Sequence, residues 1–463
     1  MISCGLVACG DAWRAGGPPD AGIIDGSGDG SDDATDNCPG LENQGGVAAQ
    51  VISSAPWARY TITASVSTGH YLGADGVDVF GPDIATAWEE GGIVTVAHRP
   101  ADPRQAWPTS VVATGVIGVE DAKLGDLDGD GIVDVASASD GGQRVYVSFG
   151  QAAAPWPTIT LTASLPHNRW MQVAIADVNG DGLLDIVGGT RGGTADNPAV
   201  IAWFENPGAL ARTGAAWSYH QISLAGWTMS VVPIDVDRDG DIDVVVSDRA
   251  SYKDAGGVTR WDLYGARWEE QTPAGWVNHA ISPPAGSCTT CTPGDEMFLR
   301  VADWNGDGQL DVLDGTSSMT DANRIAIRRN LGGWLLWSQE LVPAVTGVGH
   351  YQGIDRGDLD GDGRPDLVVS TWEVNGPPCS DVSLACSTVS GIYWLRNVSD
   401  GIWERGEISG PEGSKFDNVQ LADVDSDGDL DVVTTEQVDQ LGVVWYENPA
   451  ATVTRCSRHV RSR

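Results

Sequence analysis

A nine-residue acidic pattern occurs six times in this chain and constrains the fold more than any other feature. Each copy has Asp at positions one, five and nine, Asp or Asn at position three and Gly at position six. The first Asp residues of successive copies lie 51, 58, 68, 55 and 65 residues apart. A pattern that returns at such a period indicates a repeat architecture. The copies are DLDGDGIVD (126–134), DVNGDGLLD (177–185), DVDRDGDID (235–243), DWNGDGQLD (303–311), DLDGDGRPD (358–366) and DVDSDGDLD (423–431).

Short apolar runs surround each copy in a constant order. One run precedes the acidic loop, a Val/Ile run follows it, and a third run has an aromatic centre, as in VIAWFEN (200–206) and VVWYEN (443–448). A fourth element begins with Trp, as in WSYHQI (217–222). The 60 Gly and 24 Pro residues of the 463 punctuate these runs as turns. Four short strands per repeat predict an all-β fold, a β-propeller with four-stranded blades.

The Trp element predicts how the ring closes. An eroded loop copy, GADGVDV (73–79), raises the number of blades to seven. Seven Trp elements match seven blades only if the N-terminal WARYTI (57–62) completes the last blade, which removes two exposed sheet edges. The C-terminal RCSRHV (455–460) is the competing candidate for that strand. The other Trp elements begin at Trp107, Trp156, Trp217, Trp276, Trp337 and Trp403.

Oxygen-bearing side chains recur at alternate positions of each loop. Carboxylates at positions one, three, five and nine, with the carbonyl of position seven, can surround one hard cation, while Gly at position six permits the bend. The loop begins like an EF-hand but lacks the terminal Glu, since position twelve of the first copy is Ser137. We expect about six structural Ca²⁺ ions and no catalytic role for them. The candidate ligands are Asp126, Asp128, Asp130, Ile132 and Asp134; Asp177, Asn179, Asp181, Leu183 and Asp185; Asp235, Asp237, Asp239, Asp241 and Asp243; Asp303, Asn305, Asp307, Gln309 and Asp311; Asp358, Asp360, Asp362, Arg364 and Asp366; and Asp423, Asp425, Asp427, Asp429 and Asp431.

The face of the propeller opposite these loops can also be read from the sequence. It carries the connections between blades and those between the second and third strands. Aromatic residues beside charged groups suit a polar ligand with apolar faces, such as a sugar, although each aromatic residue can instead pack between blades. The candidate ligand-facing residues are Glu89, Glu90, Glu120, Asp121, Trp170, Trp227, Asp248, Arg249, Glu296, His350, Trp372, Lys415, Asp417 and Glu436.

The net charge of −37, from 27 basic and 64 acidic residues, opposes binding to nucleic acids or anionic membranes. No run approaches the roughly 18–20 apolar residues of a membrane span. The start, MISCGLVACGD, resembles the end of a lipoprotein signal, with Cys9 as the acylated residue. We expect a truncated lipoprotein signal over 1–9, a flexible acidic linker over 10–50, the propeller over 51–450 and a tail over 451–463. The location is then outside the cytoplasm, secreted or lipid-anchored.

Six further cysteines fit that location. Cys288 with Cys291 and Cys379 with Cys386 are candidates for two local disulfides, and Cys38 with Cys456 for one that locks the ring. A four-cysteine zinc site and a redox CxxC pair are the alternatives, disfavoured by the long second spacing and by the missing βαβ context.

Taken together, the repeats resemble the FG-GAP/VCBS family of calcium-loop propellers, the architecture of integrin α-subunit heads and of several lectins. The resemblance covers about residues 52–450 and implies fold more than function, because the family includes adhesion, sugar binding and occasional lyase or dehydratase chemistry. The leading hypothesis is a monomeric binding module for carbohydrate or a protein partner. A sugar-active enzyme and a structural envelope protein are the alternatives, and no reaction-specific motif favours the enzyme.

Overall fold

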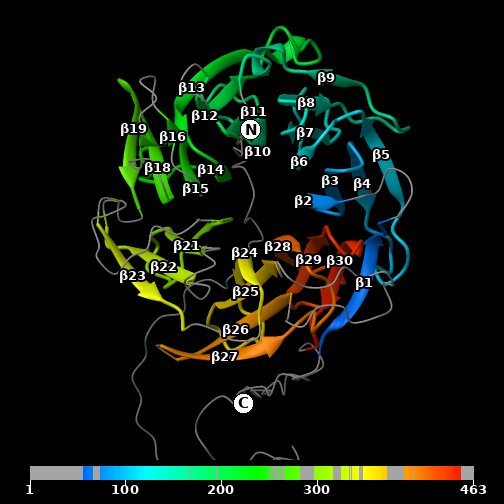
Figure 1. The fold of residues 1–463 in the computed structure, drawn as a ribbon, viewed down its shortest axis with the longest axis vertical. Helices are drawn as coiled ribbons and strands as arrows, with labels where there is room; N and C mark the ends of the chain where they lie inside the picture. The colour runs from blue at the N-terminus through cyan, green and yellow to red at the C-terminus, as the bar shows by residue number, and fades with distance from the viewer. Residues whose placement is uncertain are drawn as a thin grey trace, which may run out of the picture.

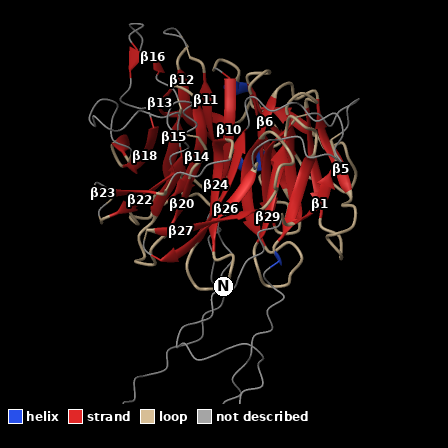
Figure 2. Ribbon diagram, turned by 60° about the horizontal axis from the view of Figure 1, so that its bottom comes forward, coloured by secondary structure: helices blue, strands red, loops and turns tan. Residues whose placement is uncertain are grey.

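Seven four-stranded antiparallel sheets form a ring in the computed structural model (Figure 1). Figure 2 shows the strands standing side by side, with loops gathered at the two ends of the disc. The structure describes residues 56–65, 73–167, 169–193, 197–249, 252–253, 259–260, 265–281, 297–315, 325–332, 334, 336–343, 348–372, 391–399 and 401–449.

Each of the first six blades uses four strands in chain order, from the centre outward. Blade one contains β2 (Ala74–Phe80), β3 (Asp83–Trp88), β4 (Ile93–His98) and β5 (Thr109–Thr114). Blade two contains β6 (Val119–Gly125), β7 (Asp134–Ser139), β8 (Arg144–Ser148) and β9 (Thr158–Thr160). Blade three contains β10 (Arg169–Ala176), β11 (Asp185–Arg191), β12 (Ala199–Glu205) and β13 (Ser218–Ala225). Blade four contains β14 (Thr228–Ile234), β15 (Asp243–Asp248), β18 (Gly265–Thr272) and β19 (Gly275–Ala280), with the hairpin β16 (Tyr252–Lys253) and β17 (Thr259–Arg260) inserted.

The remaining blades follow the same order except for the last strand of the ring. Blade five contains β20 (Arg300–Ala302), β21 (Asp311–Gly315), β22 (Ile325–Asn330) and β23 (Trp337–Leu341). Blade six contains β24 (His350–Gly357), β25 (Asp366–Trp372), β26 (Ile392–Ser399) and β27 (Ile402–Glu407). Blade seven contains β28 (Phe416–Ala422), β29 (Asp431–Glu436), β30 (Gly442–Glu447) and β1 (Ala58–Thr63). Two 3₁₀ turns, η1 (Thr162–Ser164) and η2 (Gly208–Leu210), complete the described elements. Among the described residues, no helix has the length and hydropathy needed to cross a membrane.

The apolar core is divided into seven clusters, and each cluster lies mainly between two adjacent blades. On β29, for example, Val432 packs toward blade six and Val433 packs toward blade one. Both faces of an inner strand are therefore buried, which explains why these strands read as continuous apolar runs and not as an alternating pattern. Sheets stacked face to face in this way make a closed ring without a central core.

The first described strand, β1, pairs with β30 at the outer edge of blade seven. Trp57, just before β1, is 5% exposed and packs between blades six and seven, as the other Trp elements pack against the preceding blade. Ile62 of the same strand joins the cluster shared by blades seven and one. Burial of these side chains ties the N-terminal strand into the ring. The C-terminal competitor, 455–460, lies outside the described residues.

The prediction of an eroded loop at 73–79 is wrong. Residues Ala74–Phe80 form β2, and only Gly81 and Pro82 connect this strand to β3. The pairing of Phe80 with Asp83 corresponds to that of Gly125 with Asp134 in blade two. Blade one therefore has a tight turn where the other six blades have a nine-residue acidic pattern.

Candidate metal-binding loops and polar face

All six acidic loops connect the first and second strands of a blade, so they lie on one face of the disc. Positions four and six adopt left-handed backbone conformations in every loop, with φ values from 64° to 101°. Position four is Gly in four loops but Arg238 and Ser426 in the other two. The two left-handed residues turn the chain tightly enough to bring alternate side chains to its inner side.

Hydrogen bonds to the backbone hold the loop carboxylates in the same way in each copy. In the first copy, Gly131 N–H donates to Asp126 Oδ2 (2.9 Å) and Ile132 N–H donates to Asp130 Oδ1 (2.9 Å). Asp134 accepts from Leu127 N–H (2.9 Å) and from Gly150 N–H (2.7 Å). The position-nine carboxylate therefore closes the loop and begins the second strand at once.

Four loops bring three carboxylates so close that one oxygen of each lies within 4.8 Å of the others. The two other loops have Asn at position three, which leaves them one carboxylate fewer. These donor sets are hard oxygens of the kind that calcium prefers. The four groups are Asp126, Asp128 and Asp134; Asp235, Asp237 and Asp239; Asp358, Asp360 and Asp366; and Asp423, Asp425 and Asp431.

Two observations show that these loops suit a cation. Guanidinium groups lie against the position-three carboxylates: Arg212 Nε is 2.5 Å from Asp128 Oδ2, and Arg396 Nε is 2.5 Å from Asp360 Oδ2. Arg104 contacts Asp425 in the same manner. Asp235 Oδ1 is buried without a hydrogen-bond partner in the part of the chain that the structure describes. Three position-three carboxylates thus attract positive charge, and Asp235 keeps one oxygen without a described hydrogen-bond donor.

Burial raises the pKa of the position-nine carboxyl groups, and the backbone hydrogen bonds offset this only in part. The pKa reaches about 6 for Asp134, about 7 for Asp185, Asp243 and Asp366, and about 8 for Asp431. Neighbouring loop carboxylates add to the rise. A cation in the loop would remove this repulsion.

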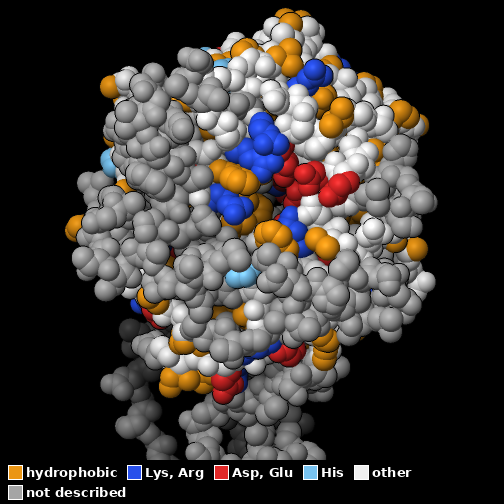
Figure 3. All heavy atoms as spheres, viewed as in Figure 1, with side chains coloured by type: hydrophobic (Ala, Val, Ile, Leu, Met, Phe, Trp, Pro, Cys, Tyr) orange, Lys and Arg blue, Asp and Glu red, His pale blue; other side chains and the backbone are white. Residues whose placement is uncertain are grey.

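The opposite face, here called the polar face, carries the blade-to-blade connections and those between second and third strands. Figure 3 shows basic and acidic side chains next to each other near the centre of one face, with hydrophobic side chains between them. On the basic side, Trp227 lies between Arg191 and Arg249, each with its guanidinium carbon 4.5 Å from the ring centroid. Arg191 also pairs with Asp140 and lies 3.7 Å from Glu120 Oε1.

The acidic side comes from blades one and two. Asp75, Glu89 and Glu120 each place a carboxylate oxygen within 4.8 Å of the others. Gln437 donates from Nε2 to Glu89 Oε2 (2.5 Å), and its side-chain oxygen accepts a hydrogen bond from Lys415. A chain of polar contacts therefore crosses from blade seven to blade three.

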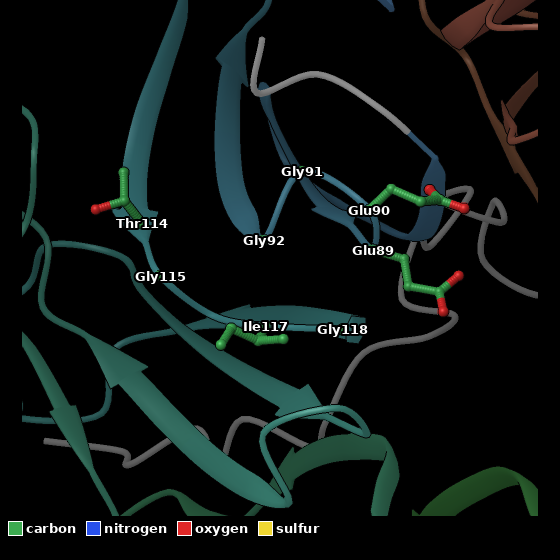
Figure 4. Close-up of a pocket in the computed structure, with 8 residues that line it drawn as sticks. All are labelled: Glu89, Glu90, Gly91, Gly92, Thr114, Gly115, Ile117 and Gly118. Atoms are coloured by element: carbon green, nitrogen blue, oxygen red, sulfur yellow. The ribbon is translucent and has the colours of Figure 1, made fainter.

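A hollow of about 310 Å³ lies beside the acidic side. In Figure 4 the carboxylates of Glu89 and Glu90 project from the connection between β3 and β4, and Ile117 lies on the neighbouring connection into blade two. Ile117 is 68% exposed, so the hollow combines apolar surface with carboxylates.

Several residues expected on the ligand-facing surface are buried. Trp170 is fully buried in the interface between blades two and three. Asp121 accepts hydrogen bonds from Val173 N–H and Ala122 N–H, and Asp248 accepts from Gly226 N–H and Trp227 N–H. Glu436 is fully buried and organises the turn after β29. These four side chains are inaccessible to a ligand, because they pack inside the protein or accept hydrogen bonds from backbone N–H groups.

The other candidates remain on or just below the polar face. Glu89, Trp227, Arg249, His350, Trp372 and Lys415 are half-buried, Glu90 is exposed, and Glu120 and Asp417 are nearly buried. Lys415 Nζ lies 3.0 Å from Asp417 Oδ1 and 5.8 Å from the centroid of the Trp372 ring, and His350 is paired with Trp372 across strands.

Sequence reasoning missed Asp75, Asp140, Arg169 and Gln437. Asp75 is hidden by its assignment to the eroded loop, while Asp140 and Gln437 lie in strand connections without a distinctive motif. Glu296, the eight cysteines including Cys9, and the expected segments 1–9, 10–50 and 451–463 lie outside the described residues.

Comparison with known families identifies the repeat. A family model described as an FG-GAP-like repeat matches residues 126–188 and 303–369. Both matches begin at the first Asp of an acidic loop and end in the second strand of the next blade. No curated protein sequence matches the chain. The chain carries FG-GAP-like repeats, folded as a seven-bladed β-propeller, the kind of scaffold that suggests a binding or adhesion module.

Proposed function

We propose that this protein is a calcium-stabilised binding module that acts outside the cytoplasm and takes a carbohydrate on its polar face. The observation that carries the proposal is the group around Trp227. The guanidinium groups of Arg191 and Arg249 stack on its ring. Arg191 also lies beside Glu120, one of the carboxylates supplied by blades one and two.

The acidic loops support the calcium part of the proposal. The ligand carboxylates, the left-handed positions and the guanidinium contacts recur at equivalent places. Calcium in the loops would be structural, because each loop joins two strands of a blade and would repel itself without a cation. Extracellular calcium modules commonly bind at about 10⁻⁴–10⁻³ M, which favours a location outside the cytoplasm, either secreted or anchored through Cys9.

The composition of the polar face supports a carbohydrate ligand. Guanidinium groups held on Trp227 and the carboxylates beside them can bind the hydroxyls of a sugar, while the half-buried ring of Trp372 can pack against its apolar face. Trp227 and Trp372 lie on different blades, and each has a basic side chain beside it. A protein partner is the competing ligand.

A glycan array with and without calcium tests the proposal. We expect binding by the wild type that is lost on removal of calcium and weakened at least tenfold by Trp227→Ala. Ile402→Ala is the matched control, because Ile402 is an exposed apolar residue on the outer strand β27. Equal weakening by both variants, or turnover of a polysaccharide in place of binding, would contradict the proposal.

Metal content provides a separate test. The purified protein should hold about six Ca²⁺ ions, and fewer than about three would contradict the assignment of the loops. Asp126→Ala should remove about one ion, because position one is Asp in every copy, whereas position three is already Asn in two of them.

A further inference from the structure

Three carboxylates near the centre of the polar face lie close enough to share one ion. Asp75 is the second residue of β2, Glu89 follows β3, and Glu120 lies in β6, so two adjacent blades supply them. One oxygen of each lies within 4.8 Å of the others. Oxygens that ligate a common calcium ion at about 2.4 Å can be no more than about 4.8 Å apart. The spacing therefore meets the geometric limit for a shared cation.

Asp417 gives a second, independent indication. It is only 4% exposed, and its Oδ2 has no hydrogen-bond partner among the described residues. Its other oxygen pairs with Lys415 Nζ at 3.0 Å. Burial is the largest cause that raises the pKa of Asp75, and the negative charge of Asp417 is the next largest. A buried, unpartnered carboxylate oxygen thus adds to the negative charge at this place.

The charges around this place do not balance. Asp75, Glu89, Glu120, Asp140 and Asp417 contribute five carboxylates. Among the described residues, three cations pair with them: Arg169 with Asp140 (2.5 Å), Arg191 with Asp140 and Glu120, and Lys415 with Asp417. With all five carboxylates ionised, the negative groups outnumber these positive groups by two.

Each of the three cations is engaged by another side chain. Lys415 is held by Asp417 and Gln437, and Arg191 stacks on Trp227 while it pairs with Asp140. No ion pair joins a described Lys, Arg or His to Asp75 or Glu89. Leaving carboxylates buried without a counter-charge is costly.

We propose that Asp75, Glu89 and Glu120 form a divalent-cation site on the polar face, separate from the six acidic loops and supported by the charge of Asp417. The hard oxygen donors and the three-carboxylate set favour Ca²⁺. Since three protein carboxylates do not complete its shell, water or the hydroxyl groups of a ligand can take the remaining positions. The site does not depend on the carbohydrate proposal.

The number of bound Ca²⁺ ions tests this site. Equilibrium dialysis against ⁴⁵Ca²⁺ should show one ion fewer in Glu89→Gln/Glu120→Gln than in the wild type. Glu90→Gln is the matched control, because Glu90 is an exposed neighbour outside the group, and it should keep the wild-type number. Equal numbers in the wild type and the double variant would overturn the proposal.

A second measurement covers the case in which the double variant does not fold. Glu89→Gln alone changes a half-buried side chain whose only described hydrogen-bond donor is Gln437, so it should fold and bind Ca²⁺ at this site at least tenfold more weakly. Crystals of the wild type soaked in Mn²⁺ should give an anomalous peak between the three carboxylates. Peaks confined to the acidic loops would overturn the proposal while leaving the loop assignment intact.

Discussion

Glu436 provides a sharp test of the difference between a ligand residue and a structural residue. Its position at the end of β29 places it among the sequence candidates for ligand binding, yet its side chain is fully buried. Oε1 accepts hydrogen bonds from four backbone N–H groups, and Oε2 accepts one from Leu441 N–H at 3.1 Å. The carboxylate therefore replaces the hydrogen bonds that the turn after β29 cannot make within the sheet.

Replacing Glu436 with Ala should destabilise the fold without changing ligand specificity. Three of the five donors, on Ser414, Asp439 and Leu441, belong to buried residues. At about 1–1.5 kcal/mol for each of these three lost bonds, we expect a loss of about 3–4.5 kcal/mol. Urea denaturation in millimolar calcium, followed by tryptophan fluorescence, measures this change in the free energy of unfolding.

Two further variants sharpen the test. Glu436→Gln keeps one acceptor oxygen but presents an amide to Leu441 N–H, so it should cost about 1–2 kcal/mol. Glu90→Ala, an exposed carboxylate on the same face, should cost less than about 0.5 kcal/mol. A loss below about 1 kcal/mol for Glu436→Ala, or equal losses for Ala and Gln, would refute the reasoning.

The remaining predictions concern the loops and the ring. In calcium-stripped protein, burial raises the pKa of Asp134 to about 6 and of Asp431 to about 8, above the ordinary value of about 3.9. The folded state then binds more protons than the unfolded state between these values, so the melting temperature should fall from pH 5 to pH 8, whereas bound calcium should reverse this trend. A rise with pH in the stripped protein would contradict the burial argument. Asn206 Nδ2 donates to Leu127 O of the preceding blade (2.7 Å), and Asn448 Nδ2 donates to Leu359 O in the same way (3.0 Å). Alanine at either Asn should therefore lower the free energy of unfolding by about 1–3 kcal/mol in urea denaturation. No loss at either site would show that these bonds do not stabilise the contact between blades. Trp57→Ala should lower the free energy of unfolding by about 3–5 kcal/mol, since Trp57 is 5% exposed between blades six and seven. An effect as small as that of Ile402→Ala would show that β1 contributes little to the stability of the ring.

The acidic pattern predicts most of the architecture because it marks one place in every repeat. Six copies in register locate the connection between the first two strands of six blades, and the Trp elements locate the fourth strands. The exception is blade one, where Asp75 and Asp78 imitate part of the pattern although they belong to β2. In the sequence alone, a short acidic segment of a strand looks like an acidic loop, because the strand that pairs with it cannot be recognised.

The polar face is much less predictable from the sequence. Trp170 lies at the start of β10 and Trp227 just before the equivalent strand β14, but the first is buried between blades and the second is half-buried beside two arginines. Which alternative holds depends on the neighbouring blade, whose residues are distant in the sequence. The pairs Lys415–Asp417 and Arg191–Asp140 likewise exist only because the strands carry them to one place.

The sequence by itself determined the repeat, the four-strand blade and the oxygen donors of the loops, because these depend on residues close together in the chain. Only the tertiary structure decided which charged side chains meet on the polar face. Asp75 and Asp417 are separated by most of the chain and become neighbours because β2 and β28 lie side by side where the ring closes. Ring closure brings together residues that are far apart in the sequence, and the grouping of charged side chains on the polar face follows from it.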